Sequence, residues 1–303
     1  MPKVSICIPA YNQDLYLRKT IDSILSQTYQ DYEIVITDDS PGNIVKELAQ
    51  GYQRPELIKY FKNATTLGSP ENWNEAMRQA SGEYIKLLHH DDWLSDPDSL
   101  AKYVAMLDEN PGADYAFSAT QAQSPAKNWD HMLDESQLKI LKENPLVLYS
   151  NNLPGAPSTG IFRRSVDMFF DPKLKWLVDI EFYIRMLHHN NHFIYTPELL
   201  LVTYVAEGRV TDECLDNKEV EIFEYLYVLN SIYKQRNQYS KTARKSCLLK
   251  AINICEKYDV NSRHEVVAYG YTGKMPRKLR TWLALKAMGN LPAKIYRTML
   301  TKH

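Results

Sequence analysis

Two pairs of adjacent acids, Asp38 with Asp39 and Asp91 with Asp92, are the residues of this sequence best suited to chemistry. Each pair follows an apolar run typical of a short buried strand, residues 33–37 before the first pair and residues 84–88 before the second. Ligands of open α/β sheets bind beyond the carboxyl ends of the strands. A carboxylate pair there can hold a hard divalent cation that completes its coordination with substrate phosphate oxygens. The acids therefore indicate chemistry on a metal-bound diphosphate.

Either pair alone also has an ordinary structural explanation, because Asp is common after strands, where its side chain binds nearby backbone amides. Taken together, the pairs are harder to explain in this way. Four like charges near one sheet edge repel one another unless a cation or hydrogen-bond donors compensate them. A nucleotide would supply donors, and its diphosphate would bring the metal. In extended geometry Asp91 and Asp92 would face opposite sides, so that one would contact the ribose and the other the ion.

Residues next to the acids could form the walls of such a site. A zinc site at His89 and His90 would need further spaced His or Cys ligands, which the sequence does not offer, so we expect both histidines to line the pocket. Pro9, Ala10 and Tyr11 follow the first predicted strand. They form either an ordinary turn or a loop that lines a nucleotide site, with the Tyr11 ring against the base.

A further acid, Asp179, lies near the start of a helix predicted over residues 177–187. Two explanations stay open. An acid near a helix N-terminus is stabilised by the helix dipole. Alternatively, Asp179 is a general base, which requires it to lie within hydrogen-bond reach of an acceptor hydroxyl.

The elements that must position these residues alternate between strand-like and helix-like segments, which is typical of an α/β fold with a mainly parallel sheet flanked by helices. Asp14 is expected to cap a helix with the apolar face Leu17, Ile21 and Ile24. A second helix is expected to start with Ser69 as N-cap and to run to about Ala80. Strands are predicted at residues 4–8, 33–37, 57–61, 84–88 and 114–118.

The character of the chain changes after about residue 210, where helical patterns replace the alternation. Apolar residues share one helical face at 222–233 and again at 247–258, and a last basic helix is predicted over 277–288. We therefore predict a catalytic α/β domain over residues 1–210 and a helical extension over 211–303.

Composition narrows the class of protein. The 44% hydrophobic and 24% charged residues are ordinary for a globular chain. The four cysteines have no disulfide or zinc spacing, no apolar stretch approaches the roughly 18 residues of a membrane span, and the first residues read as a strand. We expect a cytoplasmic protein, at most peripheral on the inner face of the cell membrane.

The net charge of −1 conceals a strongly basic tail. No acid follows Glu265, whereas eight basic residues do, namely Lys274, Arg277, Lys278, Arg280, Lys286, Lys294, Arg297 and Lys302. Such a tail is suited to an anionic lipid surface. A solvated face or a contact in a homodimer explains it equally well.

The order of these motifs resembles that of the family 2 glycosyltransferases of GT-A fold, over about residues 2–205. The matching segments are 4–12, 25–29, 32–40, 74–85, 90–92 and 179–185. The resemblance implies a Rossmann-like mixed, mainly parallel sheet flanked by helices, followed here by a C-terminal helical extension. It also implies a sheet edge that binds a nucleotide-sugar.

The resemblance implies roles for particular residues. The nucleotide pocket would contain Pro9, Ala10, Tyr11, Asp38 and Asp39. Asp91 would lie near the ribose, Asp92 would bind Mn²⁺ or Mg²⁺, and Asp179 would be the catalytic base. The chain departs from the family pattern at two positions. His89 stands where the D-x-D element often begins with Asp, which bears on metal affinity, and Glu207 stands where many relatives carry His.

The implied activity is transfer of one sugar, with inversion, from a nucleotide-sugar to a hydroxyl. We expect a UDP-sugar donor, a glycan or lipid-linked acceptor, and a place in cell-surface polysaccharide biosynthesis, with no nucleic-acid partner. Processive synthesis is not expected, because the Q-x-x-R-W element is missing. One alternative is a catalytically silent module that binds sugar nucleotides. The other is a sugar-nucleotide-forming nucleotidyltransferase, which would carry a Gly-rich loop where Pro9 to Asn12 contain no glycine.

Overall fold

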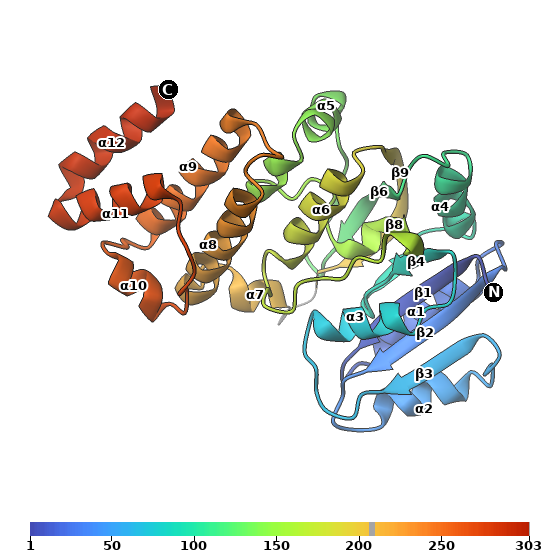
Figure 1. Ribbon diagram of the computed structural model, residues 1–303. Helices are drawn as coiled ribbons and strands as arrows, with labels where there is room; N and C mark the ends of the chain where they lie inside the picture. Colours follow the sequence, from blue (N-terminus) through green and yellow to red (C-terminus); the bar gives the residue numbers. More distant parts are fainter. Residues whose placement is uncertain (206–209, 303) are drawn as a thin grey trace. The chain divides into compact units, whose positions relative to one another are not determined.

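The computed structural model describes residues 1–205 and 210–302, which divide into two compact units (Figure 1). The first unit comprises Met1–Pro145, Asn152–Lys173 and Phe182–Glu207. The second comprises Leu146–Asn151, Leu174–Glu181 and Gly208–His303. All strands of the described residues belong to the first unit, and the described part of the second unit is built from helices.

The first unit is organised around one sheet with the strand order β3-β2-β1-β4-β8-β6-β9-β5, with β7 paired to β6. The strands β1 to β4 run parallel, β8 is antiparallel to β4 and β6, and β9 is parallel to β6. This mixed sheet confirms the predicted α/β class. The strands are β1 (Val4–Ala10), β2 (Tyr32–Asp38), β3 (Ile58–Lys62), β4 (Tyr84–Leu87), β5 (Asp92–Leu94), β6 (Tyr115–Gln123), β7 (Asn128–His131), β8 (Gly160–Arg163) and β9 (Phe193–Tyr204).

Helices flank this sheet, as Figure 1 shows for α2 and α3 beside the first four strands. Helix α3 packs against β1, β2 and β4, α4 packs against β6, β8 and β9, and α1 packs against β5. The helices of this unit are α1 (Leu15–Leu25), α2 (Ile44–Gly51), α3 (Glu71–Arg78), α4 (Ser99–Asp108), α5 (Glu135–Glu143) and, from Phe182 on, α6 (Val178–His189). The first turn of α6 belongs to the second unit. Because both faces of the central strands are covered, every residue of β1 and β2 is buried.

Local sequence explains the first helix. The Asp14 carboxylate accepts a hydrogen bond from the Leu15 amide and so caps α1, as expected. Leu17, Ile21 and Ile24 recur at helical spacing and are fully buried. The apolar stripe of α1 is therefore what fixes this helix in the unit.

The predicted strands are all present, and the differences lie in shorter or less periodic segments. Helix α3 begins at Glu71 rather than at Pro70 and ends at Arg78. The strands β5, β7, β8 and β9 and the helix α2 lie where no element was predicted. The polar segment after β6 contains α5 and two 3₁₀ turns, Pro145–Tyr149 and Pro157–Thr159.

The second unit contains the predicted helical extension. Ile222, Leu226 and Leu229 are buried on α8 (Lys218–Lys234), and Cys247 and Cys255 are buried on α9 (Lys241–Lys257). The predicted basic helix is α11 (Arg277–Met288), and the remaining helices are α7 (Val210–Cys214), α10 (Arg263–Ala268) and α12 (Asn290–Lys302). Among the described residues, none of the helices combines the length and apolar character needed to cross a membrane.

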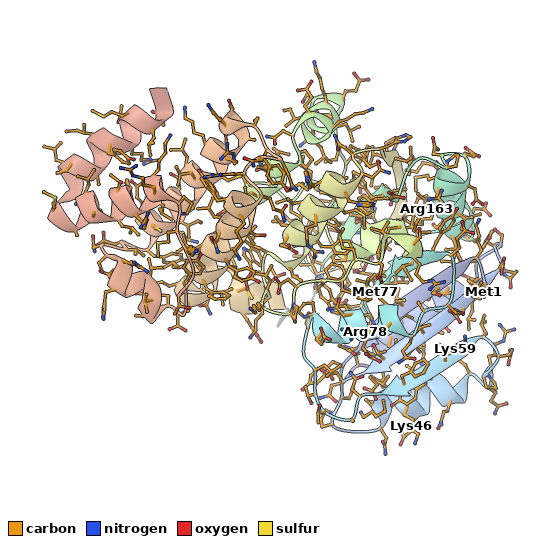
Figure 2. The ribbon with its side chains drawn as sticks, in the orientation of Figure 1. Met1, Lys46, Lys59, Met77, Arg78 and Arg163 are labelled. Atoms are coloured by element: carbon orange, nitrogen blue, oxygen red, sulfur yellow. The ribbon has the colours of Figure 1, made fainter. Side chains whose placement is uncertain are left out.

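A buried carboxylate ties together the N-terminal ends of the central strands. Glu33 on β2 accepts hydrogen bonds from the Ser5 hydroxyl (2.6 Å) and the Ser81 amide (2.7 Å), and it pairs with Lys59 on β3, which Figure 2 labels. Burial by itself would raise the pKa of Glu33, but these donors outweigh burial and lower the pKa to about 2. The charged carboxylate therefore holds β1, β2, β3 and the turn before β4 in one arrangement.

Gly82, in this turn, is expected to tolerate no side chain. A Cβ atom at Gly82 would lie 2.6 Å from the Ser5 nitrogen and 2.8 Å from the Val4 carbonyl carbon, both of which are backbone atoms that cannot give way cheaply. Gly82→Ala should lower the free energy of unfolding by about 1–3 kcal/mol in urea denaturation. Gly51→Ala is the matched control, because nothing lies within 4 Å of its Cβ. Equal stability of the two variants would contradict the prediction.

Candidate active site

The carboxyl ends of three neighbouring strands bring the predicted site residues together. β1 lies between β2 and β4, and Ala10 is opposite Asp38 in the β1–β2 pairing. The Asp39 amide donates to the Ala10 carbonyl at 3.0 Å, and His90 Nδ1 lies 3.1 Å from the Pro9 carbonyl oxygen. The loop after β1 and both acid pairs therefore share one sheet edge, as expected.

The segment after β4 is a turn, and the expectation of extended geometry for residues 89–92 was wrong. The Asp92 amide donates to the His89 carbonyl at 3.0 Å, which closes the turn. One ligating atom each of His89, Asp91 and Asp92 lies within 4.8 Å of the others. The two acids thus lie on the same side, together with His89, while His90 faces the Pro9 carbonyl. The turn forms because a local hydrogen bond replaces the strand ladder.

The chemistry of this cluster fits a divalent cation. Burial, reinforced by the charge of Asp91, raises the pKa of Asp92 well above its usual range, so a cation would relieve an unfavourable charge. Burial lowers the pKa of His89 to about 4, so the ring is neutral and keeps a lone pair for a metal. The Nε2 atom of His89 is also buried and has no hydrogen-bond partner among the described residues.

Ser158 and Lys86, which the sequence analysis did not single out, support the cluster of His89, Asp91 and Asp92. The Ser158 hydroxyl accepts a hydrogen bond from the His89 amide at 3.0 Å, and its hydrogen bond to the Asp92 carboxylate opposes the rise of that pKa. Ser158 is itself held by Lys86 of β4, whose ammonium donates to the carbonyls of Ser158 and Gly160. Burial lowers the pKa of Lys86 to about 7, and the charge of Asp92 opposes that shift.

Helix α1 fixes the turn from its other side. The Thr20 hydroxyl is buried and donates to the carbonyls of Asp92 (2.7 Å) and His90 (3.1 Å). Near the same turn, the rings of Tyr16 and Tyr204 lie 4.7 Å apart, centre to centre. The hydrogen bond to Tyr204 and burial raise the pKa of Tyr16, and the charge of Asp91 contributes to the rise. An aromatic pair therefore borders the acid cluster.

The two acids after β2 have different surroundings. The Asp38 carboxylate is fully buried and accepts hydrogen bonds from Tyr60 (2.6 Å), Lys62 (2.9 Å) and the Ser40 amide (2.8 Å). Burial would raise the pKa of Asp38, but these donors lower it. Asp38 therefore orders the strand ends.

The Asp39 carboxylate holds the loop that leads to α3. It accepts hydrogen bonds from the amides of Leu67 and Gly68, both at 2.7 Å, and from the Asn63 side chain at 2.9 Å. A carboxylate offers about four acceptor positions, so one position stays available beside these three donors. Tyr11, which follows β1, is 51% exposed, so its ring can receive a planar base.

Asp179 belongs to the second unit, on the first turn of α6, and its role as catalytic base stays a prediction. Its carboxylate accepts a hydrogen bond from the Ile180 amide at 2.8 Å. Within this unit the buried Glu224 of α8 accepts hydrogen bonds from the amides of Lys175, Trp176 and Leu177. Glu224 thereby satisfies the backbone donors before α6 and fixes the start of the helix that carries Asp179.

Two further features lie apart from this cluster. Glu207, the departure from the family pattern near the end of the first unit, lies outside the described residues. A cavity of about 430 Å³ is lined by Met77 and Arg78 near the end of α3, both labelled in Figure 2, and by Arg164 and Phe169. It contains none of the predicted site residues.

Comparison with known proteins identifies the chain's relatives. Residues 5–169 match the family model described as glycosyl transferase family 2. A Campylobacter jejuni protein named GalNAc(5)-diNAcBac-PP-undecaprenol beta-1,3-glucosyltransferase is 38% identical over 96 residues, which is 31% of this chain and 31% of that protein.

Two solved structures share the fold. S. aureus TarS 1-349 in complex with UDP-GlcNAc is 19% identical, with a TM-score of 0.65 over 99% of this chain and 90% of that one. Pyrobaculum calidifontis mannosyltransferase PcManGT, in complex with GDP-Man and Mn²⁺, is 16% identical, with a TM-score of 0.58 over 98% of this chain and 86% of that one. These likenesses establish the GT-A fold with additional C-terminal helices.

Removing the Ser158 hydroxyl should weaken cation binding without unfolding the protein. Ser158→Ala loses the contacts to His89 and Asp92, so Mn²⁺ affinity should fall about 10–100-fold, the range for a lost supporting contact of a metal ligand. Electron paramagnetic resonance of free Mn²⁺ measures the affinity. Ser124→Ala is the control, because the Ser124 hydroxyl bonds with the backbone of Lys127 in the turn before β7. Unchanged Mn²⁺ affinity in Ser158→Ala would contradict the assignment.

Proposed function

The chain belongs to glycosyl transferase family 2, and from that membership we propose that this glycosyltransferase moves one sugar from a UDP-sugar to a hydroxyl of a glycan or lipid-linked acceptor. The observation that carries the proposal is the cluster of His89, Asp91 and Asp92 at the sheet edge shared with the ends of β1 and β2. Such a cluster suits a metal-bound diphosphate, which is the part that UDP-sugars and GDP-sugars share.

The donor would lie across the ends of β1, β2 and β4. We assign the base to the pocket of Pro9, Ala10 and Tyr11, with the spare acceptor position of Asp39 facing a base N–H group. Asp38 holds the strand ends beneath it, and Asp91 lies on the ribose side. Complexes of two proteins of this fold with UDP-GlcNAc and with GDP-Man support a nucleotide-sugar as the donor.

A divalent cation would be held by Asp92, together with His89 and Asp91. When bound, it supplies positive charge that offsets the negative charge developing on the departing nucleoside diphosphate. An imidazole nitrogen beside carboxylates favours Mn²⁺ over Mg²⁺, because Mg²⁺ prefers oxygen ligands. The Mn²⁺ in the complex of the related mannosyltransferase supports this choice.

The chain's own residues would move one proton. As the acceptor oxygen attacks the anomeric carbon, the bond between that carbon and the diphosphate oxygen breaks, and the configuration inverts. The proton of the acceptor hydroxyl passes to the Asp179 carboxylate, a role worth about 10²–10⁴-fold in rate. A single carboxylate acting as base is enough for this displacement, whereas a glycoside hydrolase needs two carboxylates that flank the glycosidic bond it cleaves.

The acceptor class follows from a relative and from the charge of the chain. The C. jejuni relative is named for a glycan carried on PP-undecaprenol, a lipid-linked acceptor. We propose an acceptor of that class, used in cell-surface polysaccharide biosynthesis, with the enzyme peripheral on the inner face of the cell membrane. The basic tail, at the other end of the chain from the donor residues, suits such a place.

Donor binding is expected to depend on both the metal and Asp92. With Mn²⁺ and a UDP-sugar at 100 times its dissociation constant, the protein should gain about 2.7 kcal/mol of stability, seen as a higher thermal midpoint. The Asp92→Asn variant should lose most of this gain and should no longer hydrolyse the donor to free sugar. The Asp130→Asn variant changes an exposed acid of β7 and should keep both properties. Binding without any turnover would instead favour a silent nucleotide-sugar-binding module.

Asp179 is expected to affect turnover and not donor binding. Asp179→Asn should lower kcat about 10²–10⁴-fold and leave the Mn²⁺-dependent thermal shift unchanged. Glu219→Gln is the matched control, because Glu219 is an exposed acid on the first turn of α8. If Asp179 only stabilises the helix dipole, both variants should lose about 0.3–1 kcal/mol of stability and neither should lose activity.

A further inference from the structure

The end of α11 and the last helix, α12, carry an apolar stripe that faces solvent. Met288, Leu291, Ile295 and Met299 are 77%, 69%, 49% and 57% exposed, and we call these four residues the apolar stripe. Three of them recur at every fourth position of α12, which places them on one side of the helix. No other stretch in the part of the chain that the structure describes gathers as many exposed large apolar side chains so closely.

The opposite side of α12 is fixed to the second unit. Ala293 and Leu300 are buried, and the Arg297 guanidinium contacts Glu256 and Asn253 of α9, each at 2.6 Å. Lys245 of α9 also donates to the Thr301 carbonyl at 3.0 Å. The stripe is therefore held outward by specific contacts and is not the loose side of a frayed helix end.

Positive charge is concentrated in the same stretch of the chain as the stripe, residues 274–302. Lys286 and Arg297 are paired with Asp259 and Glu256. Five other basic residues of this region are exposed, and the described residues provide no acidic partner for them: Lys274, Arg277, Lys278, Arg280 and Lys294. Because no acid follows Glu265, this charge is not offset along the chain.

The combination selects one kind of partner. A symmetric contact between two copies would bring identical basic residues together, and four side chains cover only part of the roughly 800 Å² that a stable interface buries on each partner. A nucleic-acid backbone would use the positive charge but not the apolar stripe. An anionic bilayer uses both, because apolar side chains enter the headgroup boundary while Lys and Arg contact the lipid phosphates.

We propose that the apolar stripe and the basic residues around it form a docking surface for an anionic lipid bilayer. The inference deepens the proposed function, since a lipid-linked acceptor lies in such a bilayer, but it is tested separately from catalysis. The stripe would enter the boundary between headgroups and acyl chains, and the five basic residues would lie at the level of the phosphates.

The first experiment measures sedimentation of the full chain with vesicles of phosphatidylcholine, with and without phosphatidylglycerol. The wild type should bind the anionic vesicles, and Leu291→Gln with Ile295→Gln and Met299→Gln should bind at least about tenfold more weakly. The control is Leu215→Gln with Val267→Gln, two exposed apolar residues of the same unit. Control binding should match the wild type, and the thermal midpoints of all variants should agree.

Each outcome decides the proposal. Full vesicle binding by the triple variant would overturn the proposal. It would also be overturned if the wild type were a dimer and the triple variant a monomer, because the stripe would then contact a second copy. Donor hydrolysis with Mn²⁺ is measured in parallel and should be equal in all variants. If the wild type binds vesicles but hydrolyses no donor, the proposed function is contradicted and the docking surface is still supported.

A second measurement reports insertion directly and does not depend on a loss of binding. The four native cysteines are buried, so Met299→Cys provides one accessible thiol for a polarity-sensitive fluorophore. Its emission should shift to the blue with anionic vesicles, whereas Val267→Cys on α10 should show no shift. Equal responses at the two positions would overturn insertion of the stripe.

Discussion

The arrangement of the candidate site depends on one buried lysine, Lys86. Lys86 stands in the middle of a strand whose other residues are apolar, and its ammonium donates to the carbonyls of Ser158 and Gly160. Those contacts fix the 3₁₀ turn that places the Ser158 hydroxyl against His89 and Asp92. Because the charges of Lys86 and Asp92 also favour each other, the same side chain compensates part of the acid cluster.

That compensation of the acid cluster is incomplete, and the uncompensated negative charge favours binding of a cation. Asp91 and Asp92 lie close together, and burial disfavours the charged form of Asp92. A cation would lower the energy of this arrangement, so metal binding and the stability of the turn should be coupled. The Asp38 and Asp39 carboxylates differ in this respect, because backbone amides and side-chain donors already satisfy most of their acceptor positions. The two acid pairs look alike in sequence but differ in how far hydrogen-bond donors already satisfy their carboxylates.

The sequence predicted what local patterns determine. Apolar runs located β1 to β4, and their parallel order explains why distant acids share an edge. It could not predict the turn at residues 89–92, which one backbone hydrogen bond decides. Ser158 and Glu224 act on residues about 50 or more positions away, so no local pattern reveals them. Lys86, a basic residue inside an apolar strand, was a signal that the sequence offered. Its role became clear only once the structure showed its partners, the carbonyls of Ser158 and Gly160.

The chain separates its charges, and each group requires a different counterpart. The acids at the sheet edge are buried or nearly so, whereas Lys274, Arg277, Lys278, Arg280 and Lys294 are exposed. Salt screens exposed charges over about 8 Å at physiological ionic strength and screens buried ones much less. Rising salt should therefore weaken an interaction of the tail with lipid phosphates well before it weakens a cation at Asp92. The apolar stripe, which salt does not screen, would then carry what binding remains, so ionic strength can separate the contributions of charge and apolar contact at one surface.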